Sequence, residues 1–113
     1  MMFNQTLVRV RAGAREDRGG NTVADWSIAT RITVTHVNIQ PSIQQEAHDE
    51  TRSSKVTGWH VQSAEGTNPD IRADDRIEWD GMVLEVDGEV ARWPDVFADS
   101  VHHVEFEMKR STG

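Results

Sequence analysis

Residues 77–93 of the chain are IEWDGMVLEVDGEVARW, and this run contains the strongest turn signals of the sequence. Apolar and polar residues alternate along it, which is typical of strands that bury one face. Asp80-Gly81 and Asp87-Gly88 interrupt the alternation. An Asp-Gly pair between two such runs favours a tight hairpin turn, because the turn needs positive φ at both positions. The run therefore predicts a meander of three short strands.

The same period recurs in four other parts of the chain, which are residues 6–11, 30–39, 56–61 and 101–108. In the last of these, Val104, Phe106 and Met108 share one face and are expected to be buried. No stretch shows the longer period of an amphipathic helix. The pattern predicts an all-β fold, a small antiparallel β-barrel or sandwich with one long polar loop and little helix.

Residues 30–39 carry an irregularity within their alternation. The step from Val34 to Val37 skips one position, which predicts a β-bulge near Thr35 and His36. Pro41 is expected to end the pairing of this strand, because proline has no N–H to donate to a ladder.

Two polar stretches are predicted to be loops. Residues 12–21 are polar and contain three glycines. Residues 42–54 have Ile43 as their only large apolar residue, so they cannot bury enough surface to offset the entropy of ordering them. A chain of 113 residues has room for one domain, so residues 1–113 are assigned to a single domain with a mobile polar loop at about 42–54.

The charge of the chain is unevenly distributed. The net charge is −7, and residues 65–107 hold 13 acidic side chains against three arginines. Proteins that grip nucleic acid need a basic stripe to neutralise phosphates, so this distribution disfavours such binding. An acidic surface is compatible with DNA that passes without sticking, since like charges repel.

The composition excludes several kinds of chemistry. There is no cysteine, which removes disulfides, thiolate catalysis and cysteine-ligated metals. No apolar run is long enough to span a bilayer, and the first residues lack the features of a secretory signal, so a soluble cytoplasmic product is expected. No Gly-x-Ser-x-Gly elbow or phosphate-binding loop is present. We expect no enzymatic activity, no catalytic residue, no metal and no cofactor.

The histidines and tryptophans are further candidate site residues. His36 and His60 are able to meet if they lie on neighbouring strands, whereas His102 and His103 are adjacent and are expected to point to opposite faces. The four tryptophans are mostly assigned to core and rim packing. Trp93 precedes Pro94 at an expected loop, so it is predicted to lie at an interface, where tryptophan is enriched.

Residues 75–93 follow the pattern D-R-I-x-W-x-G-x-x-L-x-V-x-G-x-x-x-x-W, which resembles the signature stretch of the head-closure proteins, or head-to-tail stoppers, of tailed bacteriophages. Residues 15–21, 25–26, 37–42 and 103–113 resemble other parts of that family in the same order. The resemblance covers nearly the whole chain through scattered positions.

The resemblance implies a small β-barrel without catalysis that forms a ring in the virion neck. This ring would close the DNA channel after packaging and dock the tail. The implied partners are other copies of the chain, a portal-bound adaptor above, a tail-terminator or tail tube protein below, and genomic DNA that passes without sequence-specific binding. No membrane is involved, and the protein would reach the virion after synthesis in the host cytoplasm.

The resemblance also implies roles for particular residues. The long loop of the family projects toward the channel and corresponds to residues 42–54 here. The residues assigned to this channel loop are Gln44, Gln45, Glu46, His48, Asp49, Glu50 and Arg52. The residues assigned to contacts with a neighbouring subunit or partner ring are Arg9, Arg11, Arg15, Arg18 and Trp93.

Two other functions remain open from the sequence. The first is a tail terminator or another head–tail joining protein, which would occupy a different station in the same neck. The second is a small ligand-binding or hydrolytic β-barrel, which predicts an apolar pocket with converging polar groups.

Overall fold

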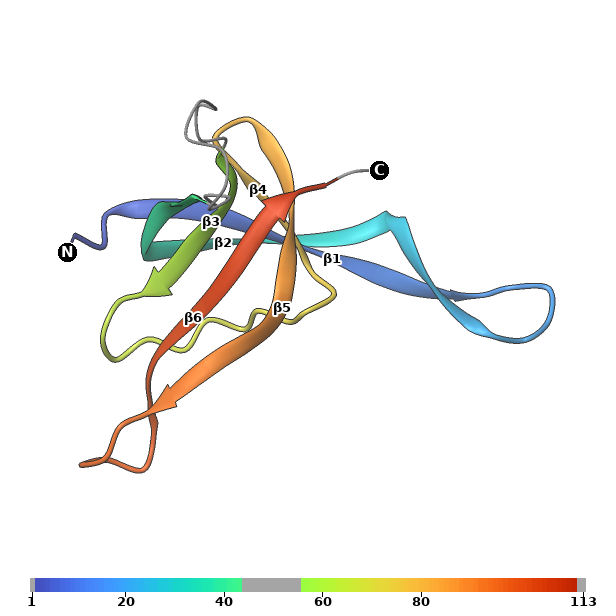
Figure 1. The fold of residues 1–113 in the computed structure, drawn as a ribbon. Helices are drawn as coiled ribbons and strands as arrows, with labels where there is room; N and C mark the ends of the chain where they lie inside the picture. The colour runs from blue at the N-terminus through green and yellow to red at the C-terminus, as the bar shows by residue number, and fades with distance from the viewer. Residues whose placement is uncertain (1, 44–55, 112–113) are drawn as a thin grey trace, which may run out of the picture.

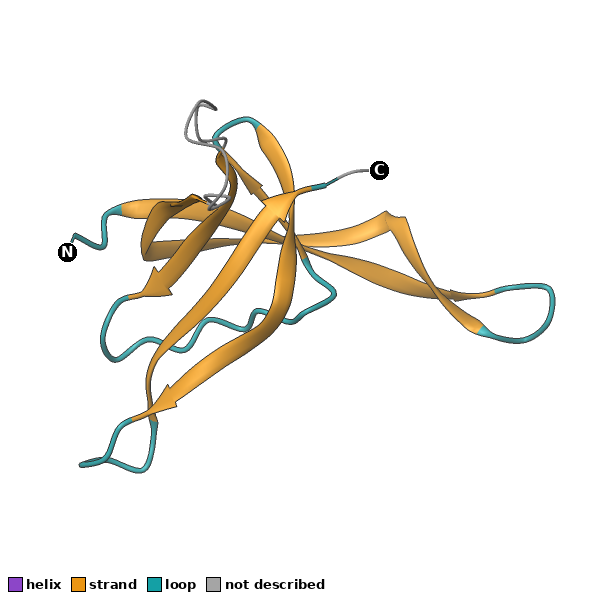
Figure 2. Cartoon of the chain, in the orientation of Figure 1, coloured by secondary structure: helices purple, strands orange, loops and turns teal. Residues whose placement is uncertain are grey.

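A computed structural model describes residues 2–43 and 56–111 of the chain as six antiparallel strands (Figures 1 and 2). The strands are β1 (Gln5–Glu16), β2 (Thr22–Ile43), β3 (Val56–Ser63), β4 (Arg76–Trp79), β5 (Met82–Pro94) and β6 (Val101–Arg110). These described residues contain no helix, and therefore none that could cross a membrane. The predicted all-β class is confirmed.

The strands close into a small barrel in the order β1-β2-β3-β6-β5-β4. The short strand β4 completes the ring, because it pairs with β1 on one side and with β5 on the other. Inward-facing side chains from every strand fill the interior, and Val104, Phe106 and Met108 are buried there as predicted. Ile71, from the loop between β3 and β4, is fully buried with them. That loop is therefore part of the core.

A two-stranded arm leaves the barrel where β1 and β2 continue beyond their other partners (Figure 1). We call residues 11–30 the arm. The predicted loop at 12–21 was too long, because β1 runs to Glu16 and pairs there with Thr22. The turn needs only residues 17–21, since the Asp17 carboxylate accepts the backbone N–H groups of Gly19 and Asn21, both at 2.9 Å. The side chain of Asp17 thus supplies a compact turn that lets the ladder continue.

Strand β2 is irregular at two places. The bulge predicted near Thr35 and His36 is confirmed, because these two residues face the single residue Thr6 of β1 and His36 has φ of 59°. A larger bulge lies in the arm, where residues 26–29 face only Ala12. It bends the arm and sets the Trp26 ring 3.9 Å from the guanidinium carbon of Arg76.

The two Asp-Gly pairs behave differently. Asp80 and Gly81 form the predicted hairpin between β4 and β5, with φ of 52° and 73°. The turn predicted at the second pair is wrong, because β5 continues through it to Pro94. Gly88, with φ of 84°, instead lies in a bulge. Both halves of β5 pair with the same strand β6, so the chain kinks there without reversing.

Pro41 does not end pairing, contrary to the prediction. It lies opposite Trp59 of β3, and the pairing continues to Ile43, which lies opposite Val56. The contact of β1 with β2 ends at Val37, so this part of β2 has a partner on one side only. Proline is tolerated on such an edge because no ladder hydrogen bond is needed on the open side. Residues 42 and 43 of the predicted loop at 42–54 are therefore part of a strand, and residues 44–55 lie outside the described part of the chain.

Candidate functional site

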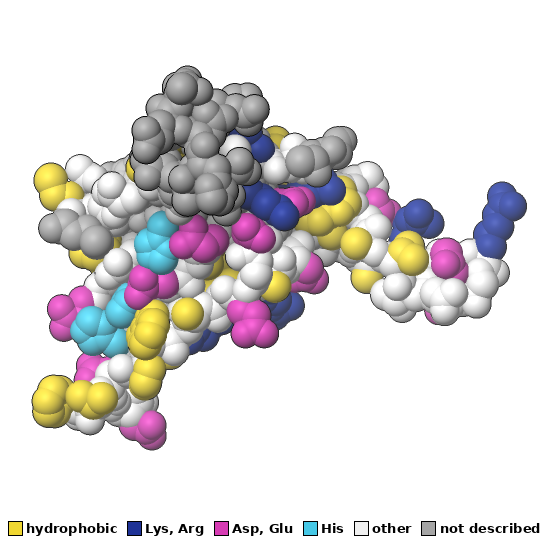
Figure 3. Space-filling view, in the orientation of Figure 1, with side chains coloured by type: hydrophobic (Ala, Val, Ile, Leu, Met, Phe, Trp, Pro, Cys, Tyr) yellow, Lys and Arg dark blue, Asp and Glu magenta, His cyan; other side chains and the backbone are white. Residues whose placement is uncertain are grey.

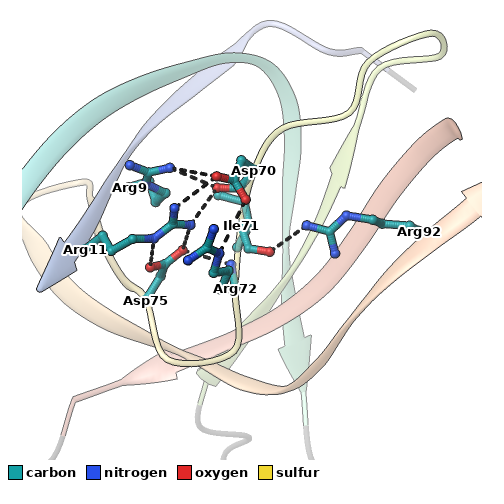
Figure 4. A network of polar contacts seen from close by, with 7 residues as sticks. All are labelled: Arg9, Arg11, Asp70, Ile71, Arg72, Asp75 and Arg92. Atoms are coloured by element: carbon teal, nitrogen blue, oxygen red, sulfur yellow. Dashed lines mark hydrogen bonds and ion pairs between the residues drawn. The ribbon is translucent and has the colours of Figure 1, made fainter. Parts of the chain in front are cut away.

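Arg11, one of the predicted contact residues, is bound within the chain (Figure 4). Its Nε and Nη2 atoms donate to the two carboxylate oxygens of Asp75, each at 2.9 Å, and its Nη1 donates to Asp70 at 2.9 Å. Asp75 is fully buried and also accepts the backbone N–H of Arg72 at 2.8 Å. These bonds raise the pKa of Arg11 and hold the pKa of the Asp70 carboxyl below its usual range. Arg11 thereby fixes the β3–β4 loop to strand β1.

Arg9 and Arg92 hold the same loop from two sides (Figure 4). Arg9 is buried, and its Nη1 donates to the carbonyl oxygen of Asp70 at 3.2 Å. Arg92, on β5, donates to the carbonyl oxygen of Ile71 at 2.8 Å. Arg9 and Arg11 therefore make contacts within their own barrel. Of the four arginines predicted to contact a neighbour, only Arg15 and Arg18 remain available on the surface.

Arg15 and Arg18 lie on the exposed end of the arm. Figure 3 shows Lys and Arg side chains at this far end of the molecule. The Arg15 Nε is 3.7 Å from Asp25, and that contact is largely open to solvent. Arg18 is exposed in the turn, and no described carboxylate lies within ion-pair distance of it. Both arginine side chains are thus exposed at the end of the arm and accessible to a partner.

Trp93 lies on the outside of the barrel near the end of β5. Its side chain is 51% exposed and stacks on the ring of His103, with ring centroids 6.3 Å apart and planes 14° apart. The following loop exposes Val96 and Phe97, the latter to 97%. Large apolar side chains gathered on a surface mark a contact site. We call Trp93, Val96 and Phe97 the Trp93 surface.

A network of histidines and carboxylates lies beside Trp93. The two ring nitrogens of His60 contact different carboxylates, Nε2 with Glu105 at 2.8 Å and Nδ1 with Glu107. Partial burial alone would lower the pKa of His60, but the two hydrogen bonds raise it. A carboxylate at each nitrogen is satisfied only when both nitrogens carry a proton, so the site favours imidazolium. Glu105 also accepts from His103 at 2.7 Å, which helps to lower the pKa of Glu105 against the opposing effect of burial.

The prediction that His102 and His103 point to opposite faces is wrong, and His36 and His60 do not meet. His60 lies opposite Gln40, so it does not meet His36. His102 and His103 lie on the same side, with ring nitrogens 2.8 Å apart. The register between β5 and β6 shifts at this point, since Trp93 pairs with His103 and Pro94 with Val101. The shift places His102 in a bulge, which removes the alternation that would separate the two rings.

An open groove of about 220 Å³ runs along this part of the barrel wall. The residues that line it are His60, Glu89, Ala91, Trp93, Glu105, Phe106 and Glu107. Ser42 donates to Glu107 at 2.8 Å, so a carboxylate lies between the hydroxyl and the imidazole of His60. A nucleophilic serine needs an imidazole next to its hydroxyl, whereas the order here is Ser42, then Glu107, then His60. Within residues 2–43 and 56–111, no three His, Asp or Glu side chains are arranged to hold a metal.

The predicted channel-loop residues, from Gln44 to Arg52, lie outside the described part of the chain. Strand β2 ends at Ile43 and β3 begins at Val56, so both ends of this segment attach to the same edge of the barrel. No protein-family model matches the chain, and no curated protein matches it.

Proposed function

We propose that this chain is a structural protein of the virion neck of a tailed bacteriophage, a head-to-tail stopper. In this role it forms a ring below the portal and adaptor, closes the DNA channel after packaging and docks the tail. One observation supports the proposal most directly. The interior of the barrel is filled by its own side chains, while the arm and the β5–β6 loop, which carries Val96 and Phe97, project from the body (Figures 1 and 3).

A shape of this kind suits assembly. A barrel with a packed interior presents its contacts on the outside, and each projection reaches toward a neighbour. Repeated around an axis, contacts that are individually weak become strong together, because each one raises the effective concentration of the next. A head-to-tail interface between identical subunits closes into a ring when its rotation permits.

The charge of the chain supports passage of DNA without adhesion. Residues 65–107 carry 13 acidic side chains and three arginines. In the proposed ring this part of the chain contributes to a channel wall that repels the phosphate backbone. DNA is then retained by steric closure, and the segment from Gln44 to Arg52 is the proposed obstacle.

The proposal is tested with heads assembled in the presence of a variant lacking residues 44–50. We expect this variant to fold and to bind portal–adaptor complexes, while the heads lose their DNA. A control variant replaces the same seven residues with a Gly-Ser linker of equal length, which separates the length of the segment from its side chains. Heads that retain DNA with the deletion variant would rule out this segment as the obstacle.

The station in the neck is tested by electron microscopy of the bound protein. A stopper is expected on adaptor-bearing heads. Binding to tail tubes in place of heads would identify the chain as a tail terminator. Tight and salt-sensitive binding of DNA by the isolated protein would contradict a repulsive channel wall.

A further inference from the structure

We propose that the arm of one copy docks on the Trp93 surface of a second copy. This inference rests on the ring assembly proposed above and names the two surfaces that form its subunit interface. The occupant of the Trp93 surface is thus the end of a neighbour's arm, which carries Arg15 and Arg18.

Beyond the contacts that Arg11 and Trp26 make with the barrel at its base, the arm has no further strand partner in the described structure. Beyond Val10, strand β1 pairs only with β2 in the described structure, and an isolated two-stranded ribbon is marginally stable in water. With a rise of about 3.3 Å per residue, the arm extends about 20 Å from Arg11 to Asp17. Ile28, at its bend, is 54% exposed and packs across Gly13. A partner that covers this ribbon would supply the support that the single chain does not.

The Trp93 surface has the chemistry that complements the arm. Arginine binds over the face of a tryptophan ring, and Trp93 presents a half-exposed ring beside a groove that also contains Glu89. The chain already uses such a contact, because Arg76 lies over the ring of Trp26 at 3.9 Å. The exposed apolar side chains Val96 and Phe97 offer a matching contact for apolar atoms of the arm.

Of the three carboxylates that line the groove, Glu89 is the one with no hydrogen-bond partner in the described structure. Glu105 already binds His60 and His103, and Glu107 binds His60 and Ser42. Glu89 is exposed on β5, at the bulge that follows Gly88. It is therefore the carboxylate that we pair with Arg18 of the neighbour.

The positions of the two surfaces make the contact one between copies. The arm and the loop of the Trp93 surface extend from opposite sides of the body in Figure 1. One chain cannot bring its own two surfaces together, and in the proposed ring each copy gives its arm to one neighbour and receives an arm from the other. Such a head-to-tail contact generates a closed ring when its rotation closes.

The absence of cysteine makes a direct test possible. Arg18→Cys and Glu89→Cys are placed in separate chains with different tags, and the two are mixed under mild oxidation. We expect a disulfide-linked heterodimer, and a ladder of linked multimers when one chain carries both substitutions. The matched control pairs Arg18→Cys with Asp74→Cys, an exposed position on the β3–β4 loop. Equal linking in the control, or no linked heterodimer at millimolar protein, would overturn the proposal.

Charge reversal provides a second readout, measured by sedimentation at increasing protein concentration. Arg18→Glu and Glu89→Arg are each expected to weaken association about threefold, which is the scale of an exposed ion pair, and the two together are expected to restore it. Trp93→Ala is expected to weaken association tenfold or more. Weakening by the double variant equal to the sum of the single effects would exclude the Arg18–Glu89 pair.

The test separates the interface from the proposed function. A protein that binds adaptor-bearing heads and retains DNA, but gives no Arg18–Glu89 linkage, remains a stopper with a different subunit interface. A protein that forms the linked multimers but binds no part of a phage neck retains the interface and loses the proposed function.

Discussion

Replacing Asp75 with alanine is predicted to destabilise the fold strongly. Asp75 is fully buried, accepts two hydrogen bonds from Arg11 and caps the β3–β4 loop through the N–H of Arg72. Removing one partner of a buried ion pair costs about 3–5 kcal/mol, because the other charge is left unpaired. The side chain of Arg11 is 21% exposed and retains Asp70, so the lower end, about 3 kcal/mol, is expected.

The assay is urea unfolding followed by tryptophan fluorescence, for which the buried Trp59 is a suitable probe. With a slope of about 1.5 kcal/mol per molar urea, a loss of about 3 kcal/mol lowers the unfolding midpoint by about 2 M. The control is Asp74→Ala at the neighbouring exposed residue, which is expected to change stability by less than about 0.5 kcal/mol. A loss below about 1 kcal/mol for Asp75→Ala, or one equal to the control, would refute the assignment of Asp75 as the anchor of the loop.

Three further predictions concern the barrel and the arm. The pKa of His60 is raised, so the stability that its ion pairs provide is present below pH 6.5 and is lost as the pH rises through the pKa of the folded state. The variant His60→Gln should therefore show a smaller difference in urea midpoint between pH 6 and pH 8 than the unchanged protein. An equal difference would contradict the role of the His60 ion pairs in stability. Leu84→Ala removes a fully buried side chain and should cost about 2–5 kcal/mol in urea unfolding, whereas a cost near zero would place Leu84 outside the core. Gly13→Ala would bring a Cβ atom to 2.5 Å from the side chain of Ile28 and to 2.9 Å from its carbonyl oxygen, so the arm must shift locally. Limited proteolysis should then cut the arm faster while the barrel midpoint changes little, and unchanged cleavage would show that the arm accommodates the added methyl group without opening.

Local patterns in the sequence were sufficient for features that depend on neighbouring residues. Asp80-Gly81 forms its hairpin because both residues adopt the positive φ that the turn needs. The bulge at Thr35 and His36 follows from a break in the alternation of a single strand. The buried face of Val104, Phe106 and Met108 is likewise a property of one strand.

Features that depend on which distant strand a segment pairs with could not be predicted from local sequence patterns. Asp87-Gly88 has the same turn chemistry as the first pair, yet its two flanking segments both pair with β6, and this prevents a reversal. The contacts of His60 depend on the register between β3 and β6, two strands that are far apart in the sequence. The prediction that Arg11 contacts a neighbouring subunit or partner ring fails because nothing local shows that the loop carrying Asp75 folds back against β1.

The order of strands around the barrel has a consequence for synthesis of the chain. The arm joins segments that are close in sequence, so it is able to form as soon as both have left the ribosome. Strand β6 is the last to be made, and it belongs between β3 and β5. Until it arrives, both of those strands present open edges, which attract other nascent or misfolded chains. A truncation before Val101 would leave this gap permanently open, and such a product is expected to precipitate in the cell.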